Sequence, residues 1–198
     1  MITLLLLAVL AGAAVMFYFE GLWSALVALI NVLFAAAFAT AWYEWPANLL
    51  QQAMPSFGSL ADFVCVWIIF AVVLLAVGEA TNRVSRTRVM FQPEVDRYGA
   101  PVVGLLVGWI LVCFTAMTLH LAPVTKDLIQ PAPDERLFLG LAPDRKWVSF
   151  VGNSTRAGPF SNPGANEANA FDKDRDFVER HANRRAKLEG ETSLLVQP

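Results

Sequence analysis

Residues 98–124 read YGAPVVGLLVGWILVCFTAMTLHLAPV, a stretch that has no Asp, Glu, Lys or Arg and has one histidine, His120. A bilayer core about 30 Å thick needs about 20 apolar helical residues, because every N–H and C=O group in lipid must be paired within the segment. This stretch is both long enough and apolar enough to cross the bilayer as a helix. We therefore predict that it forms a transmembrane helix.

Three earlier stretches have the same composition. Residues 1–19 and 21–43 contain no charged side chain, and residues 63–78 contain none between Asp62 and Glu79. The whole chain is 56% hydrophobic and 16% charged, which is too apolar for an ordinary soluble domain of this size. We expect an all-α integral membrane protein with about four transmembrane helices.

The composition changes after the fourth stretch. From Thr125 onward Pro, Asp, Arg, Asn and Gly are frequent, and most of the chain's charges lie there. We predict two regions on this basis. Residues 1–124 form a four-helix transmembrane domain, and residues 125–198 form a hydrophilic, partly ordered C-terminal tail with short helices.

The first two stretches are separated only by Glu20 and Gly21. One helix over both would be about twice as long as a bilayer is thick, so we predict a tight hairpin there. The first stretch also resembles a signal peptide, with an apolar run at residues 4–10 and small residues at 11–13. A transmembrane helix is favoured because no Lys or Arg precedes the run, which continues to Phe19.

Arginines near the ends of the stretches predict their direction, since Lys and Arg favour the cytoplasmic side. The segment between the third and fourth stretches contains four arginines. Residues 44–62 contain neither Lys nor Arg, and with Trp45 and Pro46 they are expected to form an interfacial loop. The third stretch therefore runs inward and the fourth outward, which places the N-terminus and the tail outside the cytoplasm. The four arginines are Arg83, Arg86, Arg88 and Arg97.

Small residues indicate where the helices pack, because lipid tails are as apolar as leucine and close approach must hold the helices together. Gly104 and Gly108 form a GxxxG pair in the fourth stretch. We predict that they pack against another helix of the same chain in preference to a dimer partner. Cys65 and Cys113 are expected to be small apolar packing residues.

Three ionisable residues at the ends of the stretches are candidate functional residues. Glu79 either is drawn into the membrane or lies at headgroup level beside Arg83, one helical turn away. Asp96 and Arg97 either complement the start of their own helix and the lipid headgroups, or form a junction with another span or a partner.

Two short helices are predicted in the tail. Residues 144–151 follow Pro143 and form an amphipathic pattern, and residues 152–166 have the composition of a loop. A mixed-charge helix follows and ends near Gly190. Its aromatic side chains are expected to contact a partner or the rest of the tail. The candidate partner contacts are Trp147, Phe171 and Phe177.

Two other interpretations of the tail are weaker. Asp172, Asp174 and Asp176 have the spacing of the first ligands of a calcium loop, but Phe177 replaces its glycine and Asn183 its closing glutamate. Basic side chains on the last helix suggest nucleic acid, which the interleaved acids and the outside location oppose. These basic residues are Arg180, Arg184, Arg185 and Lys187.

Three features of residues 1–124 resemble the colicin V production protein (CvpA) family. They are the aromatic-Glu20-Gly21-Leu22 turn before an alanine-rich span, the arginine-bearing segment after the third span, and Asp96-Arg97 followed by spaced glycines. The chain lacks the basic residue that family members have near the first turn, and the arginine among the later glycines. The resemblance implies a four-span protein of the bacterial cytoplasmic (inner) membrane, linked with colicin V export and envelope homeostasis.

No catalytic, cofactor-binding or metal-binding pattern is visible, and His120 and His181 are the only histidines. We expect a non-enzymatic membrane subunit or scaffold in envelope maintenance or secretion. It would lie in the lipid bilayer and present its tail to other membrane or periplasmic proteins, or to a second copy of itself. The alternative is a subunit of an oligomeric channel or transporter, in which Glu79 would have a role in conduction.

Overall fold

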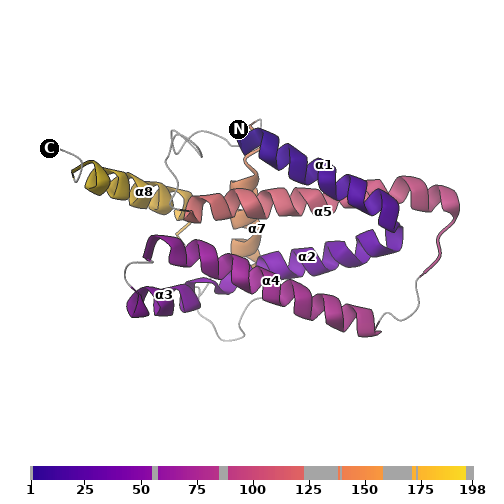
Figure 1. Ribbon diagram of the computed structural model, residues 1–198, viewed down its shortest axis with the longest axis horizontal. Helices are drawn as coiled ribbons and strands as arrows, with labels where there is room; N and C mark the ends of the chain where they lie inside the picture. The colour runs from indigo at the N-terminus through magenta and orange to yellow at the C-terminus, as the bar shows by residue number, and fades with distance from the viewer. Residues whose placement is uncertain are drawn as a thin grey trace.

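The computed structural model describes residues 2–54, 58–84, 89–122, 138, 140–157, 171–172 and 174–194. All regular structure in this part of the chain is helical, which confirms the predicted fold class (Figure 1). The helices are α1 (Ile2–Glu20), α2 (Leu22–Trp42), α3 (Glu44–Ala53), α4 (Gly58–Val84), α5 (Pro93–Leu121), α7 (Pro143–Ala157) and α8 (Phe177–Leu194).

Four of these helices, α1, α2, α4 and α5, are long and apolar enough to cross a membrane. The helices α5 and α2 lie in the middle of the bundle, with α1 packed along α5 and α4 packed along α2 (Figure 1). The two outer helices expose large apolar side chains, including Leu4 and Phe19 of α1 and Leu75 of α4. This exposure suits a lipid environment, in which apolar side chains need not be buried in protein.

The two ends of the bundle differ. One end, the turn end, contains the connection between α1 and α2, the end of α4 and the start of α5 (Figure 1). The other end, the tail end, contains α3, the start of α4, and the tail helices α7 and α8. All the described structure of the tail therefore lies against one end of the transmembrane bundle.

The glycines of α5 allow α1 to approach closely. A Cβ atom added at Gly104 would lie 3.1 Å from the Ala13 carbonyl oxygen, and one added at Gly108 would lie 3.1 Å from the Leu10 Cα atom. Contacts this short leave little space for any side chain, so the two glycines set the spacing between α1 and α5. Both glycines pack within the chain.

Several boundaries differ from the sequence predictions. Residues 44–53, expected to be part of a loop, form α3, because Pro46 lies in the first helical turn, where a missing N–H does no harm. The third and fourth spans extend beyond residues 63–78 and 98–124 at their polar ends. Helix α7 continues to Ala157, so residues 152–157 are not a loop, and residues 158–166 lie outside the described part.

Candidate functional site

The turn end contains a junction between the α1–α2 connection and α5. Gly21 has a φ of +90°, which a residue with a side chain rarely adopts. The N–H of Leu22, at the start of α2, donates a hydrogen bond to Asp96 Oδ1 at 2.8 Å. Asp96 therefore caps the N-terminus of α2 from a different helix.

Two glycines allow the segments of this junction to lie in close contact. A Cβ atom at Gly21 would lie 3.3 Å from Asp96 Oδ1, and one at Gly99 would lie 3.1 Å from Leu22 Cδ2. The structure thus brings together the Glu20-Gly21-Leu22 turn and the Asp96–Gly99 segment, which lie far apart in the sequence. Arg97 lies at this end too, and its side chain is exposed.

Glu79 lies apart from this junction. Its carboxylate accepts a hydrogen bond from Arg83 Nε at 2.8 Å, and the two side chains are 61% and 77% exposed. A partly buried polar contact lies nearby between two spans, where Thr81 Oγ1 of α4 donates to Asn31 Oδ1 of α2 at 3.0 Å. The sequence pattern indicated Glu79 and not this pair.

At the tail end, a buried polar pair joins α7 to α5. His120 Nε2 and Asp144 Oδ2 lie 2.9 Å apart, and neither side chain is more than 1% exposed. Removing one member of such a pair leaves a polar group buried without compensation, which destabilises a protein strongly. Because Asp144 is in the first turn of α7, the pair holds the start of α7 against the end of α5.

Trp147 provides a second attachment for α7. Its Nε1–H donates to Thr40 Oγ1 of α2 at 3.0 Å, and the Thr40 hydroxyl donates to the Ala36 carbonyl oxygen at 2.8 Å. The Trp147 ring also packs edge-on against Phe114 of α5, with ring centroids 6.3 Å apart. Helix α7 is therefore held to both central spans.

Helix α8 is attached to α4 by charge. Arg184 Nη1 donates to Asp62 Oδ2, and Asp62 Oδ1 accepts from Gln51 of α3. Asp62 is buried at the tail end of α4. The contact spans 122 residues of sequence, and Asp62 connects the three helices α3, α4 and α8.

The three predicted partner contacts are buried within the chain itself. Trp147, Phe171 and Phe177 are 4%, 5% and 2% exposed. The ring of Phe171 lies 5.6 Å from Phe177 and 6.5 Å from Tyr43. The bundle has apolar side chains at its tail end that the tail covers, so these aromatic residues contact the chain's own spans and are not presented to another protein.

Two acidic residues near the start of α8, Asp172 and Asp176, bind groups of the chain itself. Asp172 Oδ1 accepts the N–H groups of Asp176 and Phe177 at 3.0 Å, which caps α8, and burial raises the pKa of Asp172 in spite of these bonds. The Arg180 guanidinium hydrogen-bonds Asp176 and lowers its pKa. Among the residues with a described position, no group of three or more His, Cys, Asp or Glu side chains could hold a metal ion.

His181 lies in α8 and its side chain is buried. Its Nδ1 lies 2.8 Å from the Phe177 carbonyl oxygen, and burial lowers its pKa because the charged imidazole loses its hydration. The Phe177 carbonyl and Asp62 act in the opposite direction, whereas Arg180 and Arg184 act in the same direction as burial. The docked helix therefore favours neutral His181.

One comparison with known proteins gave a match. A family model described as Colicin V production protein matches residues 2–160, which include the four spans and α7. No curated protein and no solved structure matches the chain.

Proposed function

Because the chain belongs to the colicin V production protein family, we propose that this multi-pass membrane protein is a non-enzymatic subunit or scaffold in colicin V export or envelope maintenance. Its four spans would anchor it in the cytoplasmic membrane. Its tail helices would form the surface that other membrane or periplasmic proteins contact.

The observation that supports this proposal is the attachment of the tail to the bundle. Helix α7 is held by the His120–Asp144 and Trp147–Thr40 contacts, and α8 by Asp62. A segment held at several points presents its outer face in a fixed arrangement, which reduces the entropy lost when a partner binds. Exposed polar residues line that outer face on both helices, among them Ser149, Asn153 and Asn183.

The proposed orientation places the tail end outside the cytoplasm. Arg83 and Arg97 are exposed at the turn end, and positively charged residues favour the cytoplasmic side. The tail end then faces the periplasm, where its outer face is accessible to secretion or envelope proteins.

A channel or transporter subunit is the second candidate, and the exposed position of Glu79 supports it. A carboxylate on the outer side of α4 would meet a neighbouring copy in an oligomer and could line a path between copies. Measurement of ion flux in proteoliposomes separates the two candidates. A flux that the substitution Glu79→Gln abolishes would favour the channel, and the absence of any flux would favour the scaffold.

The scaffold proposal is tested by purification in mild detergent with the co-purifying proteins identified. We expect a partner at a fixed ratio to the chain, retained by the control variant Arg83→Glu at the turn end and lost on Lys187→Glu, whose exposed site lies on α8. The two variants make the same charge change at opposite ends of the transmembrane bundle. Purification of the chain without any partner would contradict the proposal.

A further inference from the structure

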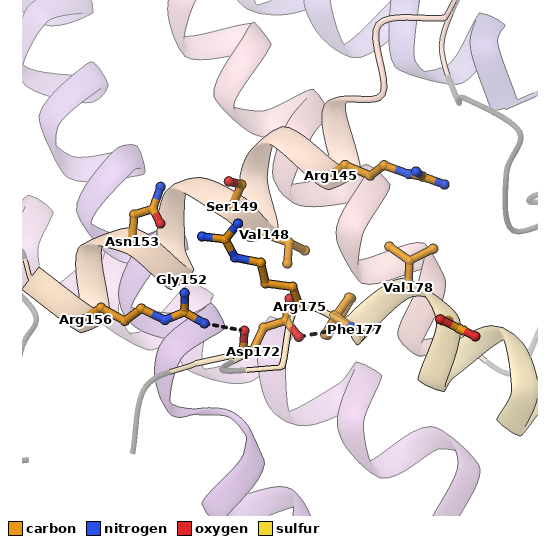
Figure 2. Close-up of a pocket in the computed structure, with 11 residues that line it drawn as sticks. Arg145, Val148, Ser149, Gly152, Asn153, Arg156, Asp172, Arg175, Phe177 and Val178 are labelled. Carbon is orange, nitrogen blue, oxygen red and sulfur yellow. Dashed lines mark hydrogen bonds between the residues drawn. The ribbon is translucent and has the colours of Figure 1, made fainter. Parts of the chain in front are cut away.

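A pocket of about 450 Å³ lies between α7 and the segment that leads into α8 (Figure 2). One wall is the side of α7 that includes Ser149, Gly152 and Asn153. The other wall is the turn from Asp172 to Arg175 and the first turn of α8. The volume of the pocket is in the range of pockets that bind small ligands.

Contacts on both sides hold the walls in place. The N–H of Phe171 donates to Thr155 Oγ1 at 3.2 Å, and Arg156 Nη2 donates to the Asp172 carbonyl oxygen at 3.1 Å. A Cβ atom at Gly152 would lie 3.3 Å from the Phe171 carbonyl oxygen, so the two segments are in close contact there. Contacts within the chain therefore connect the two walls of the pocket.

The charges around the pocket favour an anion. Three arginines line it, Arg145, Arg156 and Arg175, against two carboxylates, Asp172 and Glu179. The Asp172 carboxylate accepts two backbone N–H groups at the start of α8 and so is turned toward that helix. Among the described residues that line the pocket, the arginines outnumber the carboxylates.

Arg175 is placed by an uncommon backbone conformation. Its φ is +56°, which costs roughly 1 kcal/mol for a residue other than glycine. Its side chain extends across the pocket toward α7, where the Ser149 hydroxyl and the Asn153 amide also lie (Figure 2). Its guanidinium makes no hydrogen bond or ion pair with the residues that the structure describes.

We propose that this pocket binds a phosphate-bearing anion, such as the headgroup of a phospholipid or a free phosphate. The planar guanidinium group of Arg175 has the fork of donors that phosphate oxygens accept. Ser149 and Asn153 supply further donors on the opposite wall.

Calorimetry on the full-length protein in a neutral maltoside detergent tests this proposal. The probes are dihexanoyl phosphatidylglycerol, inorganic phosphate, and dihexanoylglycerol, which has the same chains without the phosphate. We expect phosphatidylglycerol to bind and dihexanoylglycerol not to bind. Binding of inorganic phosphate as well would identify the phosphate group as sufficient, and binding of the lipid alone would identify a phospholipid as the ligand.

Substitution at Arg175 links the binding to the pocket. Arg175→Gly removes the guanidinium and accepts the left-handed backbone, so the turn should keep its shape. We expect binding to weaken roughly 10-fold in this variant, since a charge-assisted contact to phosphate is lost, and to be unchanged in Arg83→Gln at the turn end. No binding of either phosphate probe, equal binding of dihexanoylglycerol, or an unchanged affinity in Arg175→Gly would overturn the proposal.

Discussion

The substitution Asp96→Ala tests the junction at the turn end. It removes the acceptor of the Leu22 N–H, the hydrogen bond that caps α2 from α5. Loss of a capping side chain destabilises a helix by about 1 kcal/mol, and loss of a negative charge at a helix N-terminus by about 0.5 kcal/mol more. The expected change in the free energy of unfolding is therefore about 1.5 kcal/mol.

A chain of this length loses about 3 °C of melting temperature for each kcal/mol, so Asp96→Ala should melt about 4 °C lower. Asp96→Asn keeps an acceptor oxygen and loses only the charge, so its expected decrease is about 1.5 °C. Glu94→Ala is the matched control, because Glu94 is exposed in the first turn of the same helix. It loses a charge at the start of α5 but no cap, so it should melt about 1.5 °C below the wild type.

A thiol-reactive fluorophore measures these transitions without engineered cysteines. Cys65 and Cys113 are buried in α4 and α5, so they react only when the bundle opens. The experiment is a thermal ramp in detergent on the wild type and the three variants. A melting temperature of Asp96→Ala equal to that of Glu94→Ala would refute the capping argument, and an equal decrease in Asp96→Asn would assign the effect to charge alone.

Three further predictions concern packing, the attachment of the tail, and pH. Gly108→Leu should lower the melting temperature strongly by forcing α1 away from α5, whereas Gly78→Leu, at a site with nothing within 4 Å, should leave it nearly unchanged. Trp147→Phe removes the hydrogen bond to Thr40 and keeps most of the packing, so circular dichroism should show about 1 kcal/mol less stability, and no loss would contradict the contact. The folded chain lowers the pKa of His181, so the unfolded chain takes up a proton at this site first as the pH falls. The contribution of His181 to the free energy of unfolding is therefore largest above the unfolded pKa of about 6.5 and declines as the pH falls through that value. The wild type should lose more stability between pH 7.5 and 5.5 than His181→Gln, and equal losses would contradict this.

The spans could be predicted from the sequence because their signal is local. Twenty consecutive apolar residues are sufficient to identify a membrane helix, and the stretch at 98–124 is within one such helix for most of its length. Helix α3 was not predicted, because Trp45 and Pro46 suggested an interfacial loop. Proline in a first helical turn and proline in a loop look alike without a structure.

The contacts that attach the tail had no local signal. Asp62 and Arg184 are 122 residues apart, and nothing near either residue indicates the other. His120 offered a hint, because it is the one histidine in an otherwise apolar span, but its partner Asp144 lies in the tail. Asp96 was identified as a candidate residue, whereas its target, the N–H of Leu22, is a backbone group that every residue except proline has.

Labelling of single cysteines in intact cells tests most directly whether the four spans hold the tail on the outer side of the membrane. Asn183→Cys is exposed on α8, Arg83→Cys is exposed at the turn end, and the native Cys65 and Cys113 are buried. With a membrane-impermeant maleimide, Asn183→Cys should react in intact spheroplasts and Arg83→Cys only after the membrane is permeabilised. Reaction of both sites before permeabilisation, or the reverse order, would contradict the account.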